Sequence, residues 1–266
     1  MLNVALSQAY GWAGLLEQGL DANDAALLGV ASIDQFDREF IDFSIEQWLF
    51  GIRARLLIRM GRLEEAKKCL QQMEVADGGL NDPVIEQIAH YLYVELALCF
   101  RDTTLAQVHS AKVSKIAQEH KSPYSRAFAL WCGGLVEATA GDLESAQRSY
   151  SQALELIMGT RAAVEFETEI RVSLAERHYQ AGDHEQALAT AKEALALSQQ
   201  RSNRLTECRA LIVCGGVLGQ KTDADSWSEA SLLFNQAEQL ITLTGARLYE
   251  PGLMSERDRL AQLMSR

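Results

Sequence analysis

A short pattern of small residues returns about every 40 positions along this chain of 266 residues. The equivalent alanines are Ala66, Ala106, Ala146, Ala187 and Ala230, which lie 40, 40, 41 and 43 residues apart. Pro83 and Pro123 are also 40 residues apart, and each follows a residue that can cap a helix. Self-similarity at a fixed period indicates a stack of structural repeats, in which each unit buries its apolar face against its neighbours.

The boundaries inside each repeat indicate two helices joined by a tight turn. Gly61, Gly141 and Gly182 each end one apolar helical pattern, and glycine suits the left-handed residue that follows a helix. Asp142 and Asp183 come next and can cap the following helix. The predicted helix pairs are 2–18 with 23–35, 38–60 with 63–76, 83–100 with 103–120, 123–140 with 143–158, 162–181 with 184–200, and 203–219 with 226–244, followed by a last helix near 250–265.

The chain is therefore predicted to be all-α, a right-handed α-solenoid of about six helix hairpins plus a C-terminal helix. Only three prolines are present, and no linker rich in Pro, Gly or Ser divides the chain, so we expect a single domain over residues 1–266. The expected units are 1–36, 37–80, 81–121, 122–160, 161–201 and 202–245, with the C-terminal helix at 248–266.

The unit around residues 130–153 carries a family resemblance. The small, small, small, aromatic and small positions of a tetratricopeptide repeat (TPR) are occupied by Gly134, Gly141, Ala146, Tyr150 and Ala153. The chain resembles the TPR superfamily over nearly its whole length. Its period near 40 resembles the MalT-like solenoids, which follow ATP-binding modules in bacterial signal-transduction ATPases such as the maltose regulon activator. The resemblance implies the sensing or docking part of such proteins, because their ATPase and DNA-binding parts have no counterpart here.

Charge and composition argue against several classes of function. A net charge of −11 argues against a nucleic-acid surface, which needs a basic stripe. No apolar run approaches the roughly 20 residues that span a membrane, and no basic segment of a signal peptide opens the chain. Five cysteines without a CxxC pair indicate small core residues rather than disulfides or a zinc site. We therefore expect a cytoplasmic protein that contacts neither nucleic acid nor membrane directly.

Motifs for catalysis are absent or incomplete. Residues 215–222 are one glycine short of a phosphate-binding loop, because Gln220 stands before Lys221. The repeat register also places this stretch at the end of a helix. The five histidines are scattered, and none has the four-residue spacing of a helical metal pair. The sequence therefore predicts no enzyme, no metal site and no cofactor.

The candidate site comes from helical geometry, since the first helix of each TPR pair lines the concave face of the solenoid. The register places an aromatic stripe with charges at both ends on that face. The predicted groove residues are Trp48, Arg55, Arg59, Tyr91, Glu95, Phe128, Trp131, Glu176 and Tyr179, with Thr139 and Glu169 on the same face. Rings with a few directional polar groups suit a ligand groove, and Arg beside Trp or Tyr suits a protein contact.

Two alternatives remain open at this point. Rings at helical spacing can be core instead of site, buried against the next unit, and arginines near the end of the helix 38–60 can simply favour its C-terminus. We predict a non-enzymatic ligand-sensing or protein-docking domain of a bacterial signalling or transcription-regulatory protein, which binds a small effector or a peptide in the groove. The alternative is a structural scaffold that self-associates as a homodimer through its apolar first helix.

Overall fold

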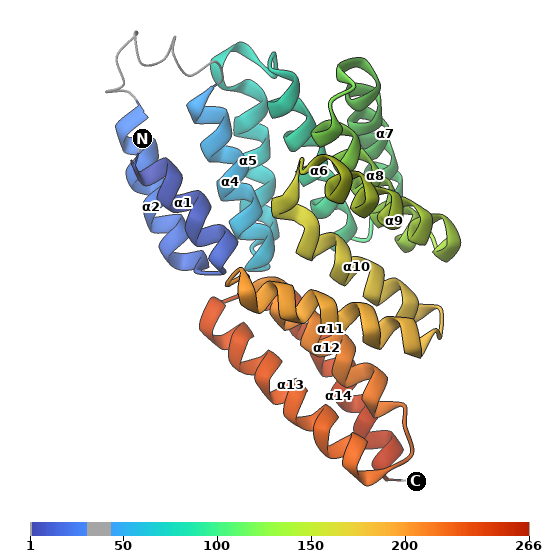
Figure 1. Ribbon diagram of the computed structural model, residues 1–266. Coiled ribbons are helices and arrows are strands. Elements are labelled where there is room, and N and C mark those ends of the chain that lie inside the picture. The colour runs from blue at the N-terminus through green and yellow to red at the C-terminus, as the bar shows by residue number, and fades with distance from the viewer. Residues whose placement is uncertain (1, 31–43, 266) are drawn as a thin grey trace.

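The computed structural model describes residues 2–30 and 44–265, which form α-helices joined by short turns, with no β-strand among them (Figure 1). The α-helices are α1 (Leu2–Ala13), α2 (Leu16–Val30), α4 (Ile45–Arg59), α5 (Leu63–Val75), α6 (Pro83–Cys99), α7 (Thr103–His120), α8 (Pro123–Thr139), α9 (Leu143–Thr160), α10 (Glu167–Gln180), α11 (His184–Gln200), α12 (Arg204–Gly219), α13 (Ala224–Thr244) and α14 (Glu250–Met264). Short 3-10 turns precede α6, α10 and α14, namely η1 (Ala76–Gly78), η2 (Val164–Phe166) and η3 (Arg247–Tyr249). The all-α prediction is confirmed.

The turns between paired helices follow the predicted chemistry. Gly141 and Gly182 adopt positive φ angles of 82° and 80°, the left-handed conformation that glycine adopts without strain. The carboxylates of Asp142 and Asp183 accept backbone N–H bonds from Ser145 and Gln186 and so cap α9 and α11. Each hairpin is therefore set locally, by a residue that ends one helix and a residue that begins the next.

Close helix contact within the hairpins depends on matched small and large residues. A Cβ atom on Gly134 would lie 2.5 Å from the ring of Tyr150, and one on Gly215 would lie 2.5 Å from the ring of Phe234. No real Cβ tolerates such distances, so these two glycines allow the aromatic rings of α9 and α13 to cross directly over α8 and α12. This interlocking is the packing that the small and aromatic pattern predicted.

The first hairpin differs from the prediction. We predicted helices at 2–18 and 23–35, but α1 ends at Ala13 and α2 begins at Leu16. The cause is Gly14, which has a φ of 75° and packs so closely that a Cβ there would lie 3.1 Å from Arg204 and 3.2 Å from Thr244. Residues 31–35 and 38–43 of the predicted helices lie outside the described residues.

Two other helices begin at different residues from those predicted. Arg161 and Ala163 both adopt a φ of 59°, which interrupts the predicted helix 162–181, so that α10 begins only at Glu167. The last hairpin helix begins earlier than the predicted Ser226, because Asp223 is its cap and accepts the backbone N–H of Ser226. In both places the local turn chemistry outweighs the repeat register.

The repeats curve so far that the first hairpin contacts the last one. Helices α11 to α14 lie below α1 and α2 (Figure 1), and Arg204 of α12 donates a hydrogen bond to the carbonyl of Ala13 at 3.1 Å. Contacts also join α1 to α12 and α4 to η3. The inner helices α4, α6, α8, α10 and α12 therefore surround a common interior.

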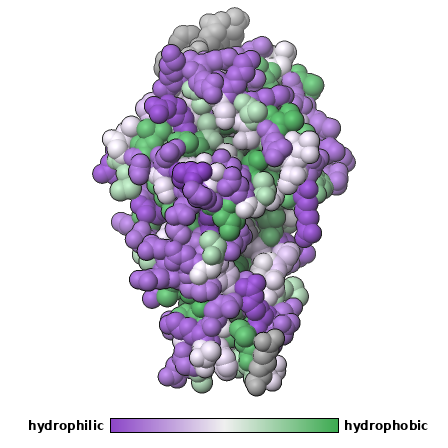
Figure 2. Space-filling view, turned by 90° about the vertical axis from the view of Figure 1, so that its right-hand side faces the viewer, coloured by the Kyte–Doolittle hydropathy of each residue, from purple (hydrophilic) through white to green (hydrophobic). Residues whose placement is uncertain are grey.

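The face shown in Figure 2 is mostly hydrophilic, with apolar side chains in small scattered groups. Most large apolar side chains of the described residues are buried or half-buried, as in other globular proteins. Within the described residues, no helix combines the length and the apolar character that crossing a bilayer requires.

Candidate functional site

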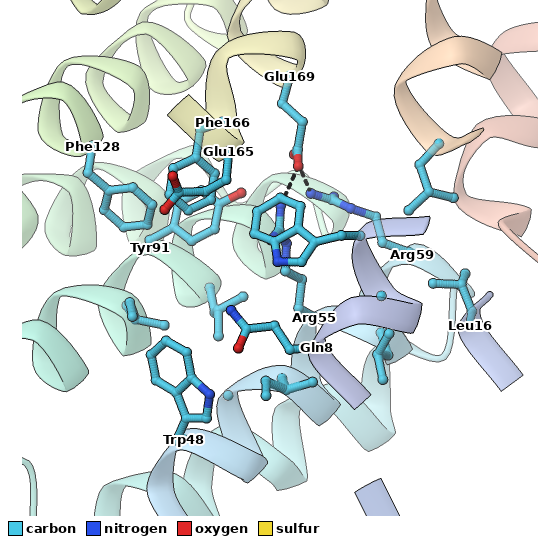
Figure 3. A pocket seen from close by; sticks show the side chains of 18 of the residues that line it. Gln8, Leu16, Trp48, Arg55, Arg59, Tyr91, Phe128, Glu165, Phe166 and Glu169 are labelled. Carbon is cyan, nitrogen blue, oxygen red and sulfur yellow. Dashed lines mark hydrogen bonds and ion pairs between the residues drawn. The ribbon is translucent and has the colours of Figure 1, made fainter. Parts of the chain in front are cut away.

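The inner helices leave a cavity of about 130 Å³ between α1, α4, α6, α8 and η2 (Figure 3). Its walls are mostly aromatic. The rings around it are Trp12, Trp48, Tyr91, Tyr124, Phe128 and Phe166. They come from five different elements, because inward positions of successive first helices converge as the solenoid curves.

Two arginines and two glutamates form a buried ionic network at one end of the cavity. Arg59 contacts Glu95 at 2.6 Å and Glu169 at 3.2 Å, and Arg55 also bonds to Glu169. Burial opposes the charged form of Glu169, but the guanidinium groups of Arg55 and Arg59 outweigh it and hold the pKa of Glu169 below its ordinary value. The network links α4, α6 and α10 through charge-assisted hydrogen bonds.

The aromatic side chains pack closely on one another and on Arg55. The Arg55 guanidinium lies over the Trp12 ring, 4.4 Å from its centroid, which is a favourable cation–π geometry. Tyr91 lies 4.6 Å from Phe128 and 5.0 Å from Trp131, measured between ring centroids. The exposed fractions of Tyr91, Phe128 and Trp131 are 2%, 2% and 1%. The predicted stripe is therefore partly core, as the sequence left open.

The cavity itself retains polar groups that the fold does not satisfy. Tyr91 lines it, and within the described residues its buried hydroxyl has no hydrogen-bond partner. Burial raises the pKa of Tyr91 well above its ordinary value, so this phenol stays protonated and can donate. Glu165 lies at the rim, exposed to solvent, beside Phe128 and Tyr91 (Figure 3).

The structure separates the predicted groove residues into three groups. Those that line the cavity are Trp48, Arg55, Arg59, Tyr91, Phe128 and Glu169. Glu95 and Trp131 lie behind its wall, where Glu95 bonds to Arg59 and the Trp131 ring packs on Tyr91 and Phe166. Because Trp131 is fully buried, truncating it would test folding rather than binding.

Glu176 and Tyr179 do not join this cavity. Glu176 pairs with Arg209 of α12 at 2.7 Å. The Tyr179 hydroxyl donates to Glu256 and accepts from Arg259, both at 2.7 Å, and both partners belong to α14. The C-terminal helix thus occupies the inner face that these two residues were predicted to present to a ligand. Thr139 is also apart, with its hydroxyl bonded to the Leu135 carbonyl within α8.

Several lining residues were missed by the sequence reasoning. Trp12 comes from the first hairpin, and its only signal was an α1 sequence apolar on more than one side. Glu165 and Phe166 belong to the 3-10 turn η2, which has no helical periodicity to indicate its direction. Tyr124 lies in the first turn of α8, four residues before Phe128 and on the same face, so helical periodicity could have identified it.

The arginines of α4 have structural partners, which bears on whether they are present only to favour the C-terminus of that helix. Arg53 bonds to Asp24 of α2, and Arg55 and Arg59 belong to the network described above. Only Arg59 lies in the last turn of the helix. Ion pairs between repeats, rather than the helix terminus, account for these cations.

The incomplete phosphate-binding motif is helical. Residues 215–219 form the end of α12, and Gly216 packs against Tyr179, so that a Cβ atom there would lie 2.9 Å from the ring. Their backbone N–H groups are therefore directed along the helix and not around a phosphate. In the described part of the chain, no group of three or more ligating side chains lies close enough to hold a metal ion.

Comparison with known proteins agrees with this fold. The sequence pattern of the tetratricopeptide repeat family matches residues 50–72, which cover the end of α4 and most of α5. A search of curated proteins found no matching sequence.

Among solved structures, PlcR of Bacillus thuringiensis, in complex with the peptide PapR7 and DNA, superposes with a TM-score of 0.67 at 15% identity, covering 82% of this chain and 78% of that one. A Rap protein complexed with Competence and Sporulation Factor gives 0.64 at 10% identity, covering 99% and 86%.

A signal-transduction ATPase with a tetratricopeptide repeat sensor, from Pyrococcus horikoshii, gives a TM-score of 0.55 at 16% identity. The match covers 89% of this chain but only 38% of that one. At these identities the likeness shows the fold alone. The chain is an α-solenoid of TPR-like hairpins, as its sequence predicted.

Proposed function

We propose that this TPR-like solenoid is a non-enzymatic docking module that recognises a peptide or a segment of a partner protein through the cavity between α1, α4, α6, α8 and η2. One observation carries the proposal. Aromatic side chains from five elements converge on a space that the chain does not fill, although neighbouring inner positions are filled by its own residues. An aromatic cavity with a few polar groups is the usual form of a recognition site.

The size of the cavity limits what enters it. Pockets for drug-sized ligands measure about 300–1,000 Å³, whereas an apolar cavity of about 150 Å³ holds benzene. At about 130 Å³, this cavity has room for one side chain and not for a length of peptide backbone. One anchoring residue therefore enters, and the rest of the partner lies outside.

The resemblance supports a biological setting. PlcR, which shares the fold, was solved with the peptide PapR7, and the Rap protein was solved with Competence and Sporulation Factor. The signal-transduction ATPase from Pyrococcus horikoshii carries its repeats as a sensor. We propose that this chain serves as the sensing or docking part of a bacterial signalling or transcription-regulatory protein in the cytoplasm.

A peptide array tests the docking function. Wild type, Trp48→Ala and Trp227→Ala are each applied to immobilised 12-residue random peptides, after thermal melts have shown that all three fold. Trp48 lines the cavity, whereas Trp227 lies on α13 with its indole N–H bonded to the Lys221 carbonyl. We expect Trp48→Ala to weaken binding of the retained peptides by about tenfold or more, as for an aromatic hot spot, and Trp227→Ala to bind as wild type. Equal binding by Trp48→Ala would reject the cavity as the docking site.

A further inference from the structure

The cavity has one negative charge without a partner. Its charged lining consists of Arg55, Arg59, Glu165 and Glu169. Glu169 and the adjacent Glu95 together neutralise the two arginines. Within the described residues, the Glu165 carboxylate forms no ion pair and no hydrogen bond, so the site as folded carries an uncompensated carboxylate at its rim.

Aromatic rings line the cavity beside that carboxylate. The ring centroid of Phe166 lies 5.2 Å from that of Phe128 and 6.1 Å from that of Tyr124. Burial, together with the nearby charge of Glu165, raises the pKa of Tyr124 to about 12, which places the carboxylate within electrostatic reach of the ring. Figure 3 shows Glu165 pointing into the space between Phe128, Tyr91 and Phe166.

Such a site has a defined ligand chemistry. Ring faces attract a cation within about 6 Å of the centroid, and a carboxylate adds a charge-assisted hydrogen bond. An anion would meet Glu165, and a neutral apolar group would leave its charge unbalanced. The long stem of Lys or Arg packs well against apolar surface while its head remains polar.

We propose that the cavity takes a single cationic side chain, Lys or Arg, of the docked segment, with its stem among Trp48, Tyr124 and Phe128 and its charge against Glu165. This inference rests on the proposed docking function and names the anchoring residue. The net charge of −11 on the chain favours the same choice, because it attracts basic segments over acidic ones.

Fluorine NMR with 5-fluorotryptophan gives a direct test. Four tryptophans give four signals, assigned by Trp→Phe variants; Trp12 and Trp48 line the cavity, and Trp227 serves as the remote reference. The probes are the blocked tripeptides Gly-Lys-Gly and Gly-Arg-Gly. Matched probes replace the central residue with norleucine, which keeps the stem without the charge, or with Glu.

We expect the cationic probes alone to shift the Trp12 and Trp48 signals in a saturable way, with Trp227 unmoved. Glu165→Gln should raise the dissociation constant at least about tenfold and preserve the thermal midpoint, since this side chain bonds to nothing in the described fold. Glu229→Gln, an exposed glutamate on α13, should bind as wild type.

The other results separate the two proposals. If the norleucine probe binds as tightly as the lysine probe, or if Glu165→Gln changes nothing, the cavity docks a side chain but the cationic assignment is wrong. If no probe at saturating concentration moves Trp12 or Trp48, both the cationic anchor and docking through this cavity are rejected.

Discussion

The inner faces of the early and late repeats start from the same scaffold and end differently. Equivalent inward positions, spaced 40, 40, 41 and 40 residues apart, hold Arg55, Glu95, Leu135, Glu176 and Gly216. In the early repeats Arg55 lines the cavity, and Glu95 pairs with Arg59 in the ionic network behind its wall. At the last position stands Gly216, where a Cβ atom would lie 3.1 Å from the Glu256 carboxylate of α14.

The difference shows what turns a concave repeat surface into a site. In the late repeats the chain supplies its own occupant, since Tyr179 is bonded to Glu256 and Arg259 of α14. In the early repeats α1 covers the inner face but leaves space beside Trp12 and Trp48. The inward register therefore identifies candidate residues in both halves, and the packing of the terminal helices decides which of them remain available.

The largest expected effect on stability compares the buried network of the early repeats with the Glu176–Arg209 pair of the late repeats. Glu169→Leu leaves Arg55 without a carboxylate partner and leaves Arg59 with Glu95 alone, so it should lower the unfolding free energy by about 3 kcal/mol. Glu176→Leu is the comparison: the side chains of Glu176 and its partner Arg209 are 35% and 16% exposed, against 9% for Glu169, so its loss should lower stability by only about 1–2 kcal/mol. Urea denaturation measures both. Equal losses would contradict the distinction between a buried network and a partly exposed pair.

The next largest effect on stability compares two inner-face glycines, Gly216 of α12 and Gly51 of α4. Gly216→Ala places a methyl group 2.9 Å from the Tyr179 ring and should destabilise by about 1–3 kcal/mol through overpacking against α14. Gly51→Ala meets only the flexible end of Met73 at 3.3 Å, so the gain in helix propensity should leave stability unchanged or raise it by up to about 1 kcal/mol. Thermal unfolding compares the two variants. A tolerated Gly216→Ala would mean that α14 does not fill the late inner face tightly.

The pH dependence of stability distinguishes the ionic network from a buried histidine pair. His90 and His109 face each other between α6 and α7, with 3.2 Å between their Nδ1 atoms, near Lys112 and Glu86. Burial and the charge of Lys112 lower the pKa of His90 to about 4 from 6.5, so the folded state binds fewer protons than the unfolded state in that interval. The unfolding free energy should therefore fall by about 1–2 kcal/mol as pH drops from 7 to 4.5.

The control for this pH effect is His90→Leu, which should flatten the stability profile in the same interval. Arg55 and Arg59 hold the pKa of Glu169 below its ordinary value, so the stability that its charge contributes is lost mainly below this interval, and the network of the early repeats contributes little to the slope. An unchanged slope in His90→Leu would assign the pH dependence to other groups.

The smallest effect compares inner-face tyrosines. Tyr179→Phe removes a hydroxyl bonded to Glu256 and Arg259 and should lower stability by about 0.5–1.5 kcal/mol. Tyr91→Phe removes a buried hydroxyl that has no partner in the described residues, so it should be neutral or slightly stabilising. Denaturant midpoints of the two variants settle the sign. A loss in Tyr91→Phe as large as that in Tyr179→Phe would show that the Tyr91 hydroxyl is satisfied.

Much of the fold could be predicted from interactions between residues that are close in the sequence. The period of 40 residues, the glycine at Gly141 with the capping Asp142, and the match of Gly134 with Tyr150 predicted helix pairs whose bounds agree closely from α5 to α9. These signals are readable because each depends on residues a few positions apart or on one neighbouring helix. The same register identified six of the residues that line the cavity, since the inward direction follows from helical periodicity.

Long-range packing decided the rest. Three features depend on how strongly the repeats curve. Trp12 stacks on Arg55, η2 directs Glu165 and Phe166 to the same space, and α14 covers Tyr179. Curvature is a sum of small rotations between successive hairpins, set by side-chain volumes at every interface. The sequence alone determined which residues turn inward, and only the tertiary structure determined which of them the protein covers with its own chain.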